Sequence, residues 1–175
     1  MPMRLFAIGT FCAGVLLCVL ASTGEASAGT LAIDCSKVDP ATAASSLGVA
    51  KVSANGSAVH IKLPPDQMDV LECGYRGVGF DPQVPAVSFA IYTPKQSDIK
   101  IVYSSLITEK HPKLQSFSPN VGSASKGLVG PDPSGEKFEA YIVFMTASNI
   151  FRIHIFNLPS AAAAQTGAQK VAAAL

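Results

Sequence analysis

Apolar and polar residues alternate along several short stretches of the chain. In residues 85–92, for example, Val87, Phe89 and Ile91 fall on one face of an extended segment. A period of two is typical of β-strands with one buried face. Comparable segments cover residues 70–75, 99–103, 138–147 and 150–157. With the hairpin described next, they predict an antiparallel sheet of about six to seven strands.

The segment before residue 70 carries a turn signal of its own. Asn55-Gly56 is a residue pair that favours the type I′ turn of a two-residue β-hairpin. Folding the chain about this pair places Val52 opposite Val59 on one face. Because the turn position agrees with the alternation on both sides, this stretch is predicted to form a β-hairpin.

A second hairpin is predicted where two strongly apolar segments meet near Ser148-Asn149. A tight turn there would pair Phe144 with Ile153 and Ile142 with Ile155. The opposite face of these two strands carries polar and aromatic side chains as well as apolar ones. These are Tyr141, Val143, Met145, Arg152, His154 and Phe156.

Helical signals stand before and after this series of strands. Asp39 is placed as an N-cap, Pro40 as a first-turn residue and Gly48 as the residue that ends a short helix. Near the C-terminus, Ser160 caps an alanine-rich segment that reaches Leu175. Both helices are predicted to pack on the sheet, which gives an α+β fold. The residues of the second helix that share one face are Ala164, Ala168 and Val171.

Residues 116–137 differ in composition from the rest because they are rich in Gly, Pro and Ser. Compact domains seldom keep a connection of this length without structure of its own. We predict a flexible loop here and leave open whether it closes over a binding site as a flap. Residues 104–111 are predicted to form a helical turn that ends before Pro112.

The N-terminal segment has the three-part layout of a secretory signal peptide. Residues 1–4 are positively charged, residues 5–21 are mostly apolar, and Ala26-Ser27-Ala28 is a small-residue cleavage site. We therefore expect residues 1–28 to be removed on export and residues 29–175 to form a single domain. This domain is expected to be periplasmic or secreted. An uncleaved membrane anchor is the alternative, because the apolar run approaches the length that spans a bilayer.

Two of the four cysteines, Cys12 and Cys18, lie inside the predicted signal peptide. The remaining pair, Cys35 and Cys73, has neither CxxC spacing nor a suitably spaced histidine, which argues against a zinc site. An even number of cysteines in an exported chain favours disulfides, so we predict one Cys35–Cys73 bond. Closing so long a loop should stabilise the fold by about 4 kcal/mol.

Three short motifs follow one another in a recognisable order: Cys35-Ser36-Lys37-Val38, Ala43-Ala44-Ser45-Ser46-Leu47-Gly48 and Glu72-Cys73-Gly74-Tyr75. This order resembles that of small exported actinobacterial domains of unknown function, typically lipoproteins. It is also similar to the extracellular sensor domain of mycobacterial receptor serine/threonine kinases. The resemblance implies an α+β fold with an antiparallel sheet, and it brings no catalytic residue. The chain departs from the family in lacking a lipid-attachment cysteine and a second disulfide, which leaves its anchorage open.

Little in the sequence points to catalysis or to a metal. His60, His111 and His154 show no HxH or HExxH spacing, and there is no G-x-S-x-G motif. We therefore predict no catalytic residue, no metal site and no cofactor. Charged residues make up 14% of the chain and the net charge is +1, which argues against nucleic acid and anionic membrane surfaces as partners.

Two functions fit these observations. The first is a binding or sensor domain for a small apolar or anionic ligand, held by Tyr141, Met145, Arg152, His154 and Phe156. The alternative for this face is burial beneath the C-terminal helix. The second function is a structural or protein-interaction module of the cell envelope, with another exported protein as its partner. The sequence favours the binding domain and does not identify its ligand.

Overall fold

The structure, a computed structural model, describes residues 35–54, 59–63, 68–79, 83–109 and 111–175. The predicted signal peptide, with Cys12 and Cys18, lies outside these residues, as does the predicted Asn55-Gly56 turn. No helix in the described ranges combines the length and the apolar character needed to cross a membrane.

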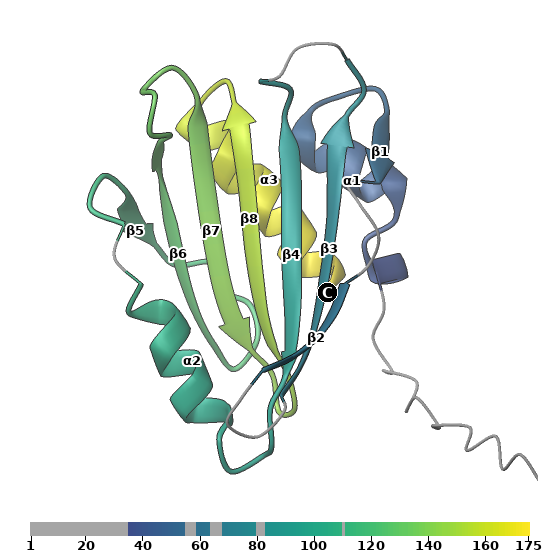
Figure 1. The fold of residues 1–175 in the computed structure, drawn as a ribbon. Helices are drawn as coiled ribbons and strands as arrows, with labels where there is room; N and C mark the ends of the chain where they lie inside the picture. Colours follow the sequence, from purple (N-terminus) through teal and green to yellow (C-terminus); the bar gives the residue numbers. More distant parts are fainter. Residues whose placement is uncertain (1–34, 55–58, 64–67, 80–82, 110) are drawn as a thin grey trace, which may run out of the picture. The chain divides into compact units, whose positions relative to one another are not determined.

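Eight strands of the described chain form one antiparallel sheet (Figure 1). In chain order they are β1 (Val52–Ala54), β2 (Val59–Leu63), β3 (Met68–Gly77), β4 (Ala86–Thr93), β5 (Gln115–Phe117), β6 (Ala124–Pro131), β7 (Phe138–Met145) and β8 (Ile150–Leu158). Their order across the sheet is β1-β3-β4-β8-β7-β6-β5, and β2 also pairs with β3. Because β4 occupies one edge of β3, β1 and β2 follow one another along its other edge.

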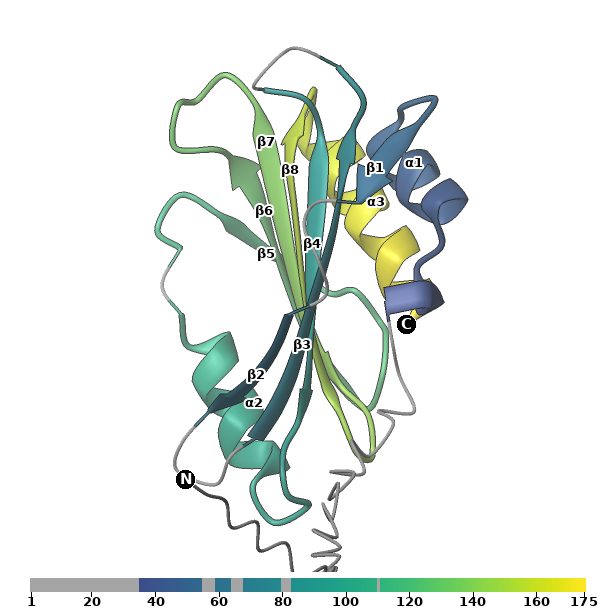
Figure 2. The ribbon, with the colours of Figure 1, turned by 45° about the vertical axis from the view of Figure 1, so that its right-hand side comes forward.

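Helices cover both faces of this sheet (Figure 2). The helices α1 (Pro40–Leu47) and α3 (Ala161–Ala174) lie on one face, and α2 (Ile99–Ile107) lies on the other. A short 3₁₀ helix, η1 (Cys35–Lys37), precedes α1. The predicted α+β fold, with a short N-terminal helix and an alanine-rich C-terminal helix on an antiparallel sheet, is confirmed.

The predicted helix ends are confirmed by their capping contacts. The Asp39 carboxylate accepts a hydrogen bond from the Thr42 backbone N–H at 2.8 Å. Gly48 ends α1 with a φ of 66°, the left-handed conformation that glycine adopts without steric penalty. At the start of α3, the Ser160 hydroxyl accepts a hydrogen bond from Ala163 N–H at 3.1 Å. Local capping chemistry therefore fixes both boundaries.

The larger core lies between the sheet and α3. Phe89, Ile153 and Ile142 lie in register across β4, β8 and β7, and none is more than 2% exposed. Ala164 and Ala168 of α3 are fully buried against the sheet. Their small side chains let the helix lie close to the strands.

Helix α1 also approaches α3 closely, and Gly167 marks the contact. A Cβ added there would overlap the backbone carbonyl oxygen of Ser46 in α1. It would also lie 2.7 Å from Cδ1 of Ile155 in β8. No side chain fits between the two helices at this position.

The predicted Cys35–Cys73 disulfide is confirmed, with 5.7 Å between the two Cα atoms. It ties η1 to the middle of β3. Close by, the buried Tyr75 hydroxyl donates a hydrogen bond to the Val38 carbonyl at 2.8 Å. Burial raises the pKa of Tyr75, and the charge of Asp39 raises it further, so the phenol remains a donor. The segment before α1 is thus held to β3 by two independent contacts.

The predicted hairpin about Asn55-Gly56 is wrong, because in the described residues β1 and β2 each pair with β3 and not with each other. Ala54 pairs with Tyr75, and Val59 pairs with Glu72. The ten-residue strand β3 is long enough to accept both segments along one edge. Pairing with a long, largely buried strand therefore outweighs the local preference of Asn55-Gly56 for a hairpin turn.

The predicted strand at residues 99–103 is also wrong, because these residues begin helix α2. Ile101, which the alternating pattern placed on the same face as Ile99 and Tyr103, is 70% exposed. The predicted helical turn that starts at residue 104 is the second half of this helix. The residues of α2 that pack toward the sheet have helical spacing: Ile99, Val102, Tyr103, Leu106 and Ile107.

Much of the predicted flexible loop at residues 116–137 is β-structure, which corrects that prediction. Strand β5 ends at Phe117, and β6 pairs with β7 along its whole length. The glycines of this segment allow close packing: a Cβ added to Gly127 would lie 2.5–2.7 Å from three atoms of the Phe117 ring. Composition alone could not distinguish this use of glycine from chain flexibility.

The β7–β8 hairpin forms as predicted, but its register differs by two residues. Phe144 pairs with Phe151 and Ile142 pairs with Ile153, because the turn comprises residues 146–149. A shift of two residues leaves every side chain on its original face of the sheet. The predicted division between the two faces is therefore retained.

Candidate functional site

The predicted binding face lies on the side of the sheet away from α3. Tyr141 and His154 are cross-strand neighbours on this face, and Met145 packs against the apolar cluster that α2 forms with the sheet. On the opposite face, Ile155 contacts the region of Gly167 in α3. The alternative prediction, burial of this face beneath the C-terminal helix, is therefore wrong.

The five residues predicted to hold a ligand are not all in contact with one another. Met145 packs under α2. Arg152 turns toward β3, where its guanidinium nitrogen is 4.0 Å from the Glu72 carboxylate, and its Cζ lies 6.0 Å from the centre of the Tyr92 ring. The rings of Tyr141, His154 and Phe156 are in direct contact, and Arg152 lines a small hollow together with Tyr141.

These three rings belong to an aromatic stack that crosses the two strands. The ring centres of Tyr141 and His154 are 4.0 Å apart with nearly parallel planes, and Phe156 lies 4.9 Å from His154. His111, from the segment before β5, adds a fourth ring 4.4 Å from Tyr141. Glu139 Oε2 joins the two central rings: it lies 2.9 Å from His154 Nε2 and accepts a hydrogen bond from the Tyr141 hydroxyl at 3.3 Å.

The stack is largely desolvated, and this burial shifts the pKa values of His154 and Tyr141. Burial lowers the pKa of His154, although the contact with Glu139 acts in the opposite direction, so the ring is neutral at pH 7. Burial and the Glu139 charge raise the pKa of Tyr141 to about 12. The hollow between this stack and α2 has a volume of about 20 Å³, which is room for one water molecule. It does not accommodate a ligand.

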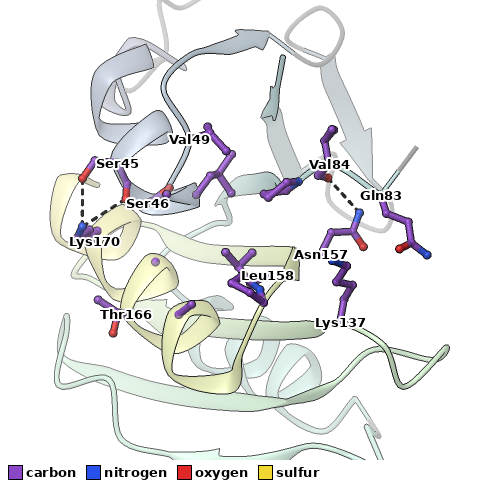
Figure 3. A pocket seen from close by; sticks show the side chains of 16 residues that line it. Ser45, Ser46, Val49, Gln83, Val84, Lys137, Asn157, Leu158, Thr166 and Lys170 are labelled. Atoms are coloured by element: carbon purple, nitrogen blue, oxygen red, sulfur yellow. Dashed lines mark hydrogen bonds between the residues drawn. The ribbon is translucent and has the colours of Figure 1, made fainter. Parts of the chain in front are cut away.

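A larger groove lies on the α1–α3 side of the sheet (Figure 3). Its volume is about 480 Å³, within the usual range for small-molecule sites. Helix α1 contributes Ser45 and Ser46, and α3 contributes Thr166, Gly167 and Lys170. The apolar part of the lining comes from the chain around β4 and β8 and from the end of α1: Leu47, Val49, Val84, Pro85, Leu158 and Pro159.

The charge of this groove has one sign. Among the described residues that line it, Lys137 and Lys170 are cationic and none is acidic. The Lys170 ammonium donates to the Ser45 carbonyl at 3.3 Å and to the Ser45 hydroxyl at 3.1 Å. Because an ammonium has three N–H donors, one remains for a further acceptor. In Figure 3, Lys137 lies across the groove from Lys170.

Asn157 shapes the wall of the groove that faces the start of β4. Its backbone is left-handed, with a φ of 62°, a conformation that costs a non-glycine residue about 1 kcal/mol. Its side-chain amide donates a hydrogen bond to the Val84 carbonyl at 3.1 Å (Figure 3). This bond holds the segment before β4 against the end of β8. Strained residues of this kind are found preferentially at binding sites.

Sequence reasoning missed the groove and the contact of Glu139. Lys137 and Lys170 carry no pattern that distinguishes them from other surface lysines. Asn157 did offer a signal, because asparagine tolerates the left-handed region and stands here two residues before a proline. Glu139 could have been found as well, since it lies two residues from Tyr141 and shares its face of β7.

Comparisons of the chain with protein-family models, with curated proteins and with solved structures gave no match. The function is therefore argued from the residues of the site themselves.

Proposed function

We propose that this protein is a non-catalytic, exported binding domain whose groove between α1 and α3 takes a small organic anion with an apolar part. The charge of the groove carries the proposal, because its described lining contains two lysines and no acidic residue. Apolar side chains such as Val84 and Leu158 would contact the apolar part of the ligand. The remaining N–H of Lys170 would donate to its anionic group.

Export is part of this proposal. The Cys35–Cys73 disulfide suits an oxidising compartment outside the cytoplasm. The N-terminal segment supports the same location, since it has the layout of a signal peptide. A ligand-binding role also agrees with the resemblance to exported sensor domains.

The test is an NMR titration of isotope-labelled protein, recovered after export, with octanoate as a probe that combines a carboxylate and an apolar tail. We expect saturable shifts of backbone amide signals at residues 45–49, 83–84 and 163–170. Lys137→Gln and Lys170→Gln should each weaken binding about tenfold, because a hydrogen bond to a charged group contributes roughly 1.5–3 kcal/mol. Lys100→Gln is the matched control, since this exposed lysine lies on α2 and carries the same charge.

Two results would contradict the proposal. One is binding that all three lysine variants weaken equally, which would indicate a non-specific effect of net charge. The other is the absence of saturable shifts at the groove. That result would leave the protein-interaction module as the better description of the chain.

A further inference from the structure

A second hollow lies on the opposite face of the sheet, beside the aromatic stack. Its volume is about 230 Å³, and its walls include Pro112, Pro131, Pro133 and Leu114. Glu139 supplies the one carboxylate among its described lining residues. Lys113 and His111 complete the lining, so this hollow differs from the groove between α1 and α3 in having a carboxylate among mainly apolar walls.

One oxygen of Glu139 has no hydrogen-bond partner among the described residues. The side chain is only 12% exposed, and both of its hydrogen-bond donors, Tyr141 and His154, reach the same atom, Oε2. No buried side-chain nitrogen or oxygen in the described residues is without a partner. Since no described residue bonds to Oε1, this oxygen is not fully buried, and Glu139 is one of the residues that line the hollow.

The charge of Glu139 is not neutralised within the stack. Tyr141 and the neutral His154 donate hydrogen bonds without bringing a positive charge. Arg152 is directed toward Glu72 on β3. Lys113 also lines the hollow, but it is an exposed residue at the surface. Among the described residues, the Glu139 carboxylate therefore has hydrogen-bond donors but no lysine or arginine ion-pair partner.

We propose that this hollow binds a small organic cation, with a primary ammonium group on Glu139 Oε1 and its methylene stem against the proline rings. A compact ammonium can donate to one oxygen, and it gains a charge-assisted hydrogen bond in a partly desolvated site. A divalent metal ion is a poor alternative, since Ca²⁺ and Mg²⁺ take about six or more oxygen ligands. The described residues contain no group of three or more acidic, histidine or cysteine side chains placed to hold a metal.

The test is an NMR titration of the exported protein with n-butylammonium. Saturable amide shifts are expected at residues 111, 113, 114 and 139, and n-butanol at the same concentrations should not produce them. Glu139→Gln preserves size and removes the charge, so it should weaken binding at least tenfold. The control is Glu109→Gln, which removes an exposed carboxylate near His111 and should weaken binding by no more than about twofold.

A second variant keeps the test decisive if Glu139→Gln perturbs the fold. Lys113 is exposed, and Lys113→Gln should tighten butylammonium binding about twofold by removing a repelling charge. Equal shifts with n-butanol, unchanged binding in a folded Glu139→Gln protein, or weaker binding in Lys113→Gln would each overturn the proposal. Octanoate binding at the groove is measured by different amide signals, so the two sites succeed or fail separately.

Discussion

Replacing Gly167 with alanine tests the closest contact in the fold. An alanine in the interior of a helix is favoured over glycine by about 1 kcal/mol, so helix propensity alone predicts that Gly167→Ala stabilises α3. The structure predicts the opposite. The new Cβ would overlap the Ser46 carbonyl oxygen and lie 2.7 Å from Ile155 Cδ1, so α1 and α3 would have to separate.

The size of the effect follows from these two opposing contributions. Overpacking a well-filled interior costs about 1–3 kcal/mol, and the upper half of that range applies because the obstructing atom belongs to the backbone of α1. Subtracting the gain in helix propensity leaves a net loss of about 1–2 kcal/mol. For a domain of this size, the midpoint of thermal unfolding should fall by about 2–8 °C.

The assay is urea unfolding followed by circular dichroism, with the disulfide intact. Thr166→Ala is the control, because this neighbouring residue is exposed and its replacement should change stability by no more than about 0.5 kcal/mol. A Gly167→Ala protein as stable as the wild type, or more stable, would show that α1 and α3 do not approach each other as described.

Two further predictions concern the stability and protonation of the domain. Replacing Cys35 and Cys73 by serine should lower the free energy of unfolding by about 4 kcal/mol, measured in urea; a loss below about 1 kcal/mol would contradict the loop-closure argument. His154 should titrate with a midpoint below 6.5 when its ring protons are followed by NMR, because burial disfavours the charged ring. The stability that comes from the neutral ring is complete above pH 6.5 and is lost as the pH falls through the folded-state pKa, so a midpoint at or above 6.5 would refute this account.

The features that sequence predicted correctly depend on short-range chemistry or on long, regular patterns. Asp39 and Ser160 cap their helices through hydrogen bonds to residues three positions ahead. The Cys35–Cys73 bond followed from the count of cysteines expected to remain after export. The apolar alternation along β7 and β8 separated the two faces of the sheet even though the register was displaced, because a two-residue shift has no effect on alternation.

The errors arose where one local pattern fitted two structures. Ile99, Ile101 and Tyr103 alternate as in a strand, yet Val102 and Leu106 complete a helical stripe, and packing against the sheet selects the helix. The Asn55-Gly56 pair favours a hairpin, but the long strand β3 offers both flanking segments a partner. In each case the deciding contact is distant in sequence, so no window of neighbouring residues contains it.

The two sites differ in how much of them a sequence can predict, and the sheet order explains the difference. The aromatic stack lies mainly on one hairpin, so alternation alone placed Tyr141, His154 and Phe156 on one face. The groove draws on five separate segments: the end of α1, the chain before β4, the residue before β7, the end of β8 and the middle of α3. They meet because β4 and β8 are paired across the sheet and because Gly167 lets α1 approach α3. Lys137 and Lys170 thus acquire a shared role only after the fold is formed, so the groove had to be found in the structure.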